Sequence, residues 1–380
     1  MTEPHFIDTP QALVAACAAL HGQPWLALDT EFVREKTYQA KLCLIQIAAS
    51  EHQVFCIDPL ALDDLDPLWA LLYDPSVTKV LHSAQQDLEI FTQVQGAPPA
   101  PLFDTQIAAA LLGYSEQIGY AHLVQQLFAI ELDKSQVRTD WAQRPLSTEQ
   151  LRYAADDVIY LCRIYQWQHQ ALSERGRLTW LDEDFAALAD PQRYQIDPQQ
   201  VWRRIKGAQR LKPAQLVVLQ TLAAWREHEA QRCDLPRRWI ADDNLLIDLA
   251  RIQPRDEQQL SRLRGFDGER RQNQKALLLG LIAEAQTVPE AQWPQPQRAV
   301  KLALEQEALV DALQALVRLC AAEHEVSPGS LAARRDLERL VHGEDIELLH
   351  GWRKALAGER VQEFLAGASA LRVSSGQLVI

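Results

Sequence analysis

Between residues 25 and 83, short apolar runs of strand length alternate with polar or turn-like segments. The first three runs are too close together to leave room for helices, which predicts an antiparallel meander of strands. A fourth run follows after a longer gap and predicts one more strand. The four runs are WLALDTEFV (25–33), LCLIQIAA (42–49), QVFCID (53–58) and TKVLHS (78–83).

Helical periodicity takes over after residue 83. The pattern predicts a helix over 84–94, a short strand end that leads into a helix over 101–113, and a long amphipathic helix over 147–172. Ser147 with Gln150 three residues later is a capping-box start for that last helix. These elements predict a mixed α/β domain over residues 1–200.

From about residue 208 onward strand signals vanish, and three helical segments occur twice in the same order. The stretch 288–298 between the two copies holds three prolines without helical periodicity, which predicts a stiff linker. We therefore expect two small helical domains, 208–287 and 299–372. The paired segments are AAWREHEA (223–230) with LCAAEHEV (319–326), IADDNLLIDLA (240–250) with LAARRDLERLV (331–341), and LRGF (263–266) with LHGW (349–352).

One segment of this acidic chain is basic. The 380-residue chain has a net charge of −13, which by itself argues mildly against a polyanionic partner. Residues 201–240 nevertheless hold nine Lys or Arg against three acids. Arg237 and Arg238 could hold phosphates while Trp239 stacks on a base. A solvated helix face with a core tryptophan explains the same residues, and both readings stay open.

Other composition signals favour a soluble cytoplasmic protein. The six cysteines lack a CxxC pair, which is typical of reduced thiols in a cytosolic protein. No run approaches the ~20 apolar residues that span a bilayer, and the N-terminal segment does not read as a signal peptide.

Two carboxylates interrupt the first predicted strand. Because side chains alternate on a strand, Asp29 and Glu31 point to the same side. Left unpaired, two such charges would cost several kcal/mol or raise one pKa. A hard divalent cation would remove that cost, and so would an ion pair with Arg34 or Lys36.

Further acids favour the cation. Asp87 lies one turn into the helix that follows a strand end, and Tyr153 and Asp157 share a face of the long helix. Four carboxylates and a phenol suit two-metal phosphodiester hydrolysis, in which two cations clamp the attacking and leaving oxygens. Asp104 is expected to cap the next helix instead, and His82 to be a structural histidine.

Three stretches resemble the exonuclease motifs of the DEDD superfamily: LDTEF (28–32), HSAQQDLE (82–89) and YAADDVIYL (153–161). The Y-x-x-x-D form of the third is typical of the tyrosine subgroup, whereas the sister subgroup has histidine where this chain has Arg152. The two helical repeats resemble HRDC domains. An exonuclease domain followed by two HRDC-like domains is the layout of the bacterial ribonuclease D family.

The resemblance implies a ribonuclease H-like mixed-sheet domain, 1–200, followed by the two helical domains. It implies that Asp29, Glu31, Asp87 and Asp157 bind two divalent cations, Mg²⁺ or Mn²⁺, with Asp29 shared between them. Tyr153 would then orient the attacking water. The second repeat has VSPGS (326–330) in place of the basic CDLPRRW (233–239), so it is expected either to bind nucleic acid or to act as a spacer around the site.

The activity so implied is that of a metal-dependent 3′ to 5′ exoribonuclease. It would release 5′-mononucleotides from the 3′ ends of tRNA precursors and other small structured RNAs, as a cytoplasmic monomer. No G-x-x-x-x-G-K-[ST] motif occurs, and neither a nucleotide cofactor nor a membrane partner is expected. The alternatives are a 3′ to 5′ DNA exonuclease, since the sequence shows no decisive contact to a 2′-hydroxyl, and a non-catalytic nucleic-acid-binding adaptor.

Overall fold

The structure is a computed structural model, and it describes residues 3–133, 135–136, 139–263, 274–295 and 301–380. The chain forms two compact units. The first unit combines Met1–Phe32, Leu42–Arg193 and Lys301–Ile380, and the second combines Val33–Lys41 with Tyr194–Val300. None of the described helices is long and apolar enough to cross a membrane.

A six-stranded mixed sheet forms the centre of the first unit, in the order β1-β4-β3-β2-β5-β6. Strands β2, β3 and β4 are neighbours in the sheet, as the predicted meander requires, and β3 pairs antiparallel with β4. β1 pairs parallel with β4, β2 with β5, and β5 with β6. The strands are β1 His5–Ile7, β2 Trp25–Val33, β3 Lys41–Ser50, β4 Gln53–Ile57, β5 Thr78–Leu81 and β6 Leu102–Asp104.

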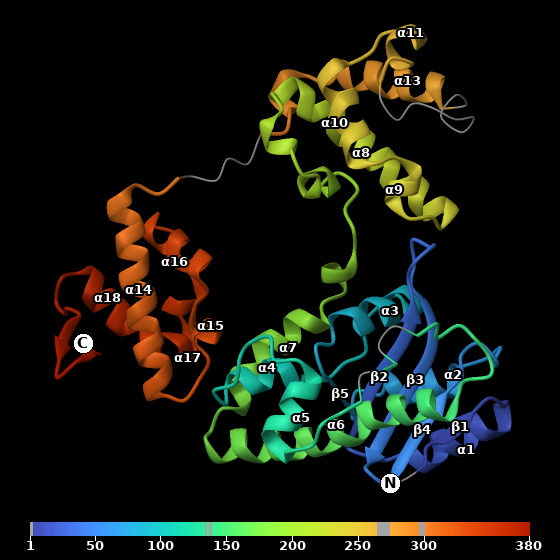
Figure 1. Cartoon of the computed structure of the whole chain (residues 1–380), viewed down its shortest axis with the longest axis vertical. Helices are drawn as coiled ribbons and strands as arrows, with labels where there is room; N and C mark the ends of the chain where they lie inside the picture. The colour runs from blue at the N-terminus through green and yellow to red at the C-terminus, as the bar shows by residue number, and fades with distance from the viewer. Residues whose placement is uncertain (1–2, 134, 137–138, 264–273, 296–300) are drawn as a thin grey trace. The chain divides into compact units, whose positions relative to one another are not determined.

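Seven α-helices lie between residues 10 and 189 of the described chain. The long helix α6 lies along one face of the sheet (Figure 1) and packs on it through Ala155, Val158 and Leu161. Its predicted capping box is present, because Gln150 N donates to Ser147 Oγ (3.2 Å) and Ser147 N donates to Gln150 Oε1 (2.8 Å). The helices are α1 Pro10–Leu20, α2 Asp66–Leu72, α3 Gln85–Gln95, α4 Thr105–Ala110, α5 Tyr120–Phe128, α6 Thr148–Glu174 and α7 Asp182–Ala189.

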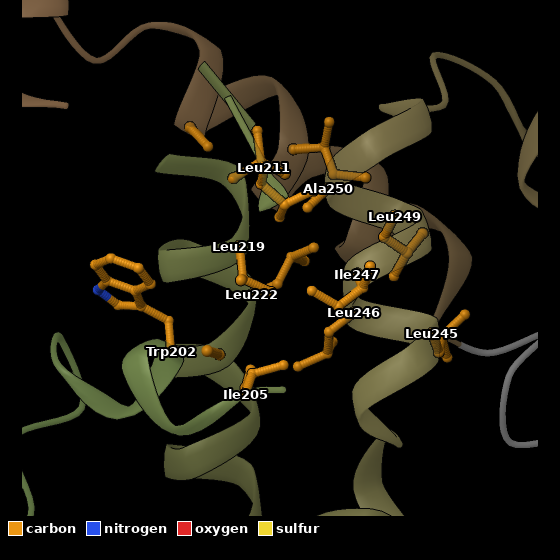
Figure 2. Packing of buried hydrophobic residues seen from close by; sticks show 14 of the residues in the cluster. Trp202, Ile205, Leu211, Leu219, Leu222, Leu245, Leu246, Ile247, Leu249 and Ala250 are labelled. Carbon is orange, nitrogen blue, oxygen red and sulfur yellow. The ribbon is translucent and has the colours of Figure 1, made fainter. Parts of the chain in front are cut away.

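The second unit is a helical core around α8 (Figure 2). Leu219 and Leu222 of α8 pack against Leu246 of α10, and Trp202 also enters this core although the helical sequence pattern begins at residue 208. Trp293 packs on the core as well, so the described start of the predicted linker is anchored. The helices are α8 Pro213–Cys233, α9 Arg237–Ile240, α10 Asp243–Ile252, α11 Glu257–Leu260 and α13 Lys275–Gln286.

Two sequence-based assignments fall partly on residues that the structure does not describe. Residues 264–266 of the LRGF segment and residues 296–298 of the predicted linker lie outside the described residues.

Residues 301–380 form a second helical segment, and it packs within the first unit. The rings of Trp180 and Trp352 stack at 4.7 Å, and Ser327 N donates to the Ala110 carbonyl (2.7 Å). The elements are α14 Leu304–Glu323, α15 Pro328–Leu331, α16 Arg334–Val341, α17 Gly351–Arg353, a π-helical turn Lys354–Gly358, α18 Glu359–Leu365 and the hairpin β7 Arg372–Ser374 with β8 Gln377–Val379.

The two helical segments repeat the order of a long helix, a one-turn helix and a helix of two to three turns. After each long helix one residue takes a left-handed conformation, Asp234 with φ 47° and Glu325 with φ 51°. The sequence alignment of AAWREHEA (223–230) with LCAAEHEV (319–326) pairs Glu229 with Glu325. The ends of the two long helices instead pair Asp234 with Glu325, so that alignment is wrong by five residues. In this register Arg237 and Arg238 of α9 correspond to Pro328 and Gly329 of α15.

Candidate active site

Strand β2 and helix α6 bring three carboxylates together. Oxygen atoms of Asp29, Glu31 and Asp157 all lie within 4.8 Å of one another. Asp29 and Glu31 share a face of β2, and Asp157 lies on α6, which the capping box and the apolar face fix against the sheet. The predicted convergence is therefore found for these three residues.

The cluster is half-buried, and both burial and neighbouring acidic charges raise the pKa values of its members. Burial, followed by the charges of Asp87, Asp157 and Glu31, raises the pKa of Asp29 well above its usual value. Burial and the same repulsion raise the pKa of Glu31 to about 9. The pKa of Asp157 rises to about 8, chiefly through burial and then through Asp156. A neutralising arginine or lysine would lower these pKa values, so the ion-pair alternative is not supported.

Asp87 lies beside this cluster. It is buried in the first turn of α3, and the Thr30 hydroxyl donates a hydrogen bond to its carboxylate. Burial raises the pKa of Asp87 to about 6. Its charge acts on both Asp29 and Glu31, although its oxygens are not among those within 4.8 Å of one another. The expected fourth carboxylate is thus adjacent to the other three and is held by the residue between Asp29 and Glu31.

Tyr153 lies one turn before Asp157 on α6. Burial and the charges of Asp157, Glu31 and Asp29 raise the pKa of its hydroxyl. The phenol is therefore protonated at neutral pH and can both donate and accept a hydrogen bond. Its ring contacts Trp141, with centroids 6.0 Å apart and planes inclined by 38°.

Two residues near the site have the structural roles expected from the sequence. Asp104 caps α4 by accepting from Gln106 N (2.8 Å), and it also accepts from Ser83 N and Ala84 N in the turn before α3. His82 is satisfied on both nitrogens, by Thr105 Oγ1 (2.9 Å) and the Ile118 carbonyl (3.0 Å).

Two residues that hold the acidic side chains in place through hydrogen bonds were not predicted from the sequence. The Tyr120 hydroxyl donates to the main-chain carbonyls of Asp156 (3.0 Å) and Asp157. The Thr30 hydroxyl holds Asp87. Thr30 could have been suspected from its place between two acids, whereas no local signal connects Tyr120 with α6.

The basic segment of the second unit contains one arginine that is already neutralised. Arg237 pairs with the fully buried Glu227 through two contacts of 2.6 Å, and its guanidinium lies 4.8 Å above the ring of Tyr38. Arg238 is exposed and Trp239 is 52% exposed, so Trp239 is not the core residue of the alternative reading. Both line an open groove of ≈ 630 Å³ together with Arg204.

The comparisons with known proteins agree with this arrangement. A family model described as 3′-5′ exonuclease matches residues 4–170, and the HRDC domain model matches residues 215–282. Ribonuclease D of Acidiphilium cryptum is 39% identical over 384 aligned residues, covering 100% of this chain and 95% of that protein. Ribonuclease D of Gluconacetobacter diazotrophicus is 38% identical, covering 98% and 95%.

A solved structure shows the same fold over nearly the whole chain. The crystal structure of Escherichia coli RNase D, described as an exoribonuclease involved in structured RNA processing, matches with a TM-score of 0.83 at 36% identity. The match covers 96% of this chain and 99% of that one. An exonuclease of this type uses divalent metal and acts on RNA. The chain therefore belongs to the ribonuclease D family and is a 3′ to 5′ exoribonuclease.

Proposed function

We propose that Asp29, Glu31 and Asp157, joined by Asp87, hold two divalent cations, Mg²⁺ or Mn²⁺, and that these residues carry the exonuclease activity. The observation that carries this proposal is the half-buried cluster of Asp29, Glu31 and Asp157, whose oxygen atoms lie within 4.8 Å of one another and whose pKa values are raised first by burial and then by neighbouring carboxylates. Hard carboxylate oxygens suit such cations. We assign Asp29 as the shared ligand because the charges of the other three carboxylates, Asp87, Asp157 and Glu31, all act on it.

Each residue then has a defined task in hydrolysis. Bound cations would lower the pKa of the attacking water and stabilise the charge that develops on the phosphate. The carboxylates of Asp29, Glu31 and Asp157 would hold the cations close together, and the Thr30 hydroxyl keeps Asp87 next to these three carboxylates. The protonated hydroxyl of Tyr153 would hold and orient the water by a hydrogen bond.

We further propose that the substrates are tRNA precursors and other small structured RNAs, trimmed from the 3′ end to 5′-mononucleotides. The printed description of the Escherichia coli relative, structured RNA processing, supports this substrate class. The monomeric state and the cytoplasmic location stay predictions. Cys43, Cys56, Cys162 and Cys320 are buried and form no disulfide, which supports a reducing compartment.

The helical segments have different proposed roles. In the second unit, Arg238 and Trp239 would contact RNA. Arg237 is bound to Glu227 by two hydrogen bonds, so its proposed role is to hold α9, and with it Arg238 and Trp239, in place. The segment 299–372 stays a proposed second HRDC-like domain. Its α15 N-terminus is occupied by Glu116, which accepts from Gly329 N (2.7 Å) and from the Ser327 hydroxyl. This supports the spacer role over RNA binding at that loop.

Asp29→Asn tests the proposal directly. We expect the variant to lose about 10³-fold or more in kcat on a 3′-extended tRNA, because a ligand shared by both cations is removed. Mononucleotide release would be followed with Mn²⁺ or Mg²⁺ and with chelator. Asp182→Asn, at an exposed carboxylate in the first turn of α7, should retain full activity. Retained activity of Asp29→Asn would refute the assignment.

A matched single-stranded DNA, assayed in parallel, separates the alternative substrates. Preference for the tRNA supports the proposal, and equal or faster hydrolysis of DNA would favour the DNA exonuclease. RNA binding without any metal-dependent product would favour the adaptor.

A further inference from the structure

One flank of Tyr153 is formed by a residue from the loop that precedes α6. Trp141 is only 3% exposed and belongs to no helix or strand. Its indole faces the Tyr153 ring with centroids 6.0 Å apart. A phenol that is only half-buried can leave its rotamer unless a neighbour prevents it, so this contact bears on where the Tyr153 hydroxyl lies.

The loop is fastened to the sheet by Arg144. Arg144 Nε donates to Asp58 Oδ2 (2.6 Å) and one terminal nitrogen donates to Asp58 Oδ1 (2.8 Å) and to the Cys43 carbonyl (2.6 Å). The other terminal nitrogen donates to the carbonyls of Trp141 (2.7 Å) and Gln143 (2.8 Å). All five N–H groups of the guanidinium therefore have acceptors, in a planar pattern that a lysine cannot reproduce.

The carboxylate that receives Arg144 is itself fixed. Asp58 directly follows β4, is buried, and accepts from Leu60 N (2.9 Å). Its main-chain N donates to the Ile7 carbonyl of β1 (2.9 Å). The Trp141 carbonyl is thus tied through one side chain to the core of the sheet.

The other end of the loop is tied to α6. The Gln150 side-chain amide donates to Thr139 Oγ1 (3.1 Å) while its oxygen completes the capping box. Ala142 N donates to Asp140 Oδ1 (3.0 Å) within the loop. Trp141 is therefore held from two sides, and Tyr153 follows Gln150 by less than one turn of the helix.

We propose that Trp141, held by Arg144, is a positioning residue that fixes the Tyr153 hydroxyl where it orients the attacking water. The inference rests on the proposed function of Tyr153. Neither Trp141 nor Arg144 needs to touch RNA or cation in this role. Displacing a reacting group by 1 Å can cost up to about 10²-fold in rate, so a passive contact of this kind affects turnover.

A double-mutant cycle between Trp141→Phe and Tyr153→Phe tests the inference. Alone, Trp141→Phe should lower kcat about 10-fold and leave KM unchanged, because the smaller ring leaves Tyr153 loosely held. Tyr153→Phe should lower kcat further by removing the hydroxyl. In the Tyr153→Phe background, Trp141→Phe should have almost no further effect on kcat, since no hydroxyl remains to be misplaced.

Two further variants separate positioning from packing. Arg144→Lys should lower kcat and show the same non-additivity with Tyr153→Phe, even if Trp141→Phe folds poorly. Trp69→Phe changes a tryptophan that is 8% exposed on α2, and it should lower the melting temperature without changing kcat.

The outcomes distinguish the inference from the function on which it rests. Full activity of Tyr153→Phe would overturn both the water-orienting role and the inference. If Tyr153→Phe lowers kcat but Trp141→Phe has an additive effect, or no effect, the inference is overturned and the water-orienting role of Tyr153 stands.

Discussion

Bringing the four carboxyl groups of the site together lowers the stability of the folded chain. Asp29, Glu31 and Asp157 bring three carboxyl groups within 4.8 Å of one another in a half-buried position, and the Asp87 charge acts on two of them. Thr30 and Tyr120 fix this arrangement by hydrogen bonds to Asp87 and to the Asp157 carbonyl, and neither neutralises a charge. The folded protein therefore responds to anything that removes the repulsion, either protons or cations.

The metal-free protein should become less stable as pH rises. Unfolded carboxylates lose their protons near pH ~4, whereas folded Glu31 and Asp157 keep them up to about 9 and about 8. Between these limits the unfolded state holds fewer protons, so the free energy of unfolding falls with pH. In chelator, we expect the melting temperature to fall by several degrees from about pH 5.5 to about pH 8.5.

Glu31→Gln provides the matched control because its amide does not titrate. Its melting temperature in chelator should fall less over the same pH range, and added Mn²⁺ at the higher pH should stabilise the wild-type chain more than the variant. Parallel pH profiles for the two proteins would show that the cluster does not control stability in this range.

At the scale of elements, the sequence predicted those parts whose signal is local. The strands over 25–83, the capping box at Ser147 and the cap at Asp104 are all confirmed, because alternation and side-chain capping are read from neighbouring residues. Strand β1 is only three residues long, and its pattern is too short to stand out.

Long-range partners could not be predicted in this way. The buried Glu227 on α8 receives Arg237 from the next helix and the Tyr38 hydroxyl from the β2–β3 connection. Tyr38 N and Gln39 N also donate to Asp234 Oδ1 (3.0 and 2.9 Å). Nothing in the local sequence pattern indicates that these segments are partners. The sequence therefore predicted the same ability to bind RNA for Arg237 and Arg238. Trp141 was missed for the same reason, since its loop lacks periodicity.

Helix α18 should depend on a glycine. A Cβ added at Gly358, in the π-helical turn before α18, would lie 2.2 Å from the Leu348 carbonyl oxygen. That oxygen is main chain and cannot rotate away, so Gly358→Ala should destabilise the segment by about 1–3 kcal/mol. Hydrogen exchange of α14 and α18, compared with the wild-type chain, measures the loss locally.

Gly280→Ala is the corresponding control in α13. A Cβ there meets no atom within 4 Å, and alanine should stabilise the helix by about 0.4–1 kcal/mol. Unchanged exchange in Gly358→Ala would mean that the main chain around Leu348 adapts without cost.

At the scale of the whole molecule, charge is distributed unevenly. The chain carries −13 overall, yet the segment 201–240 is rich in Lys and Arg. Three of those arginines are already paired inside the second unit, so the count of basic residues overstates what RNA can use. The pairs are Arg226 with Asp243, Arg232 with Glu229, and Arg237 with Glu227. Arg204 and Arg238 appear in none of these pairs, and together with Trp239 they line the groove that we propose for a phosphate backbone and a base.

Arg238→Glu should weaken RNA binding without changing the chemistry. We expect KM for a 3′-extended tRNA to rise several-fold with kcat unchanged, because the carboxylate cluster is untouched. The slope of log affinity against log salt should decrease by about 0.7, the value for a single strand when one phosphate is no longer neutralised. Trp239→Ala should weaken binding by about 1–3 kcal/mol and leave that slope unchanged, since stacking releases no counterions.

Arg335→Glu separates a local contact from the effect of net charge. Arg335 is exposed on α16, in the helical segment to which we assign no RNA contact, and its reversal changes the net charge by the same amount. If the groove binds RNA, KM and the salt slope should change much less in Arg335→Glu than in Arg238→Glu. Equal changes in the two variants would mean that RNA responds to the total charge of the chain, and the groove would lose its assignment.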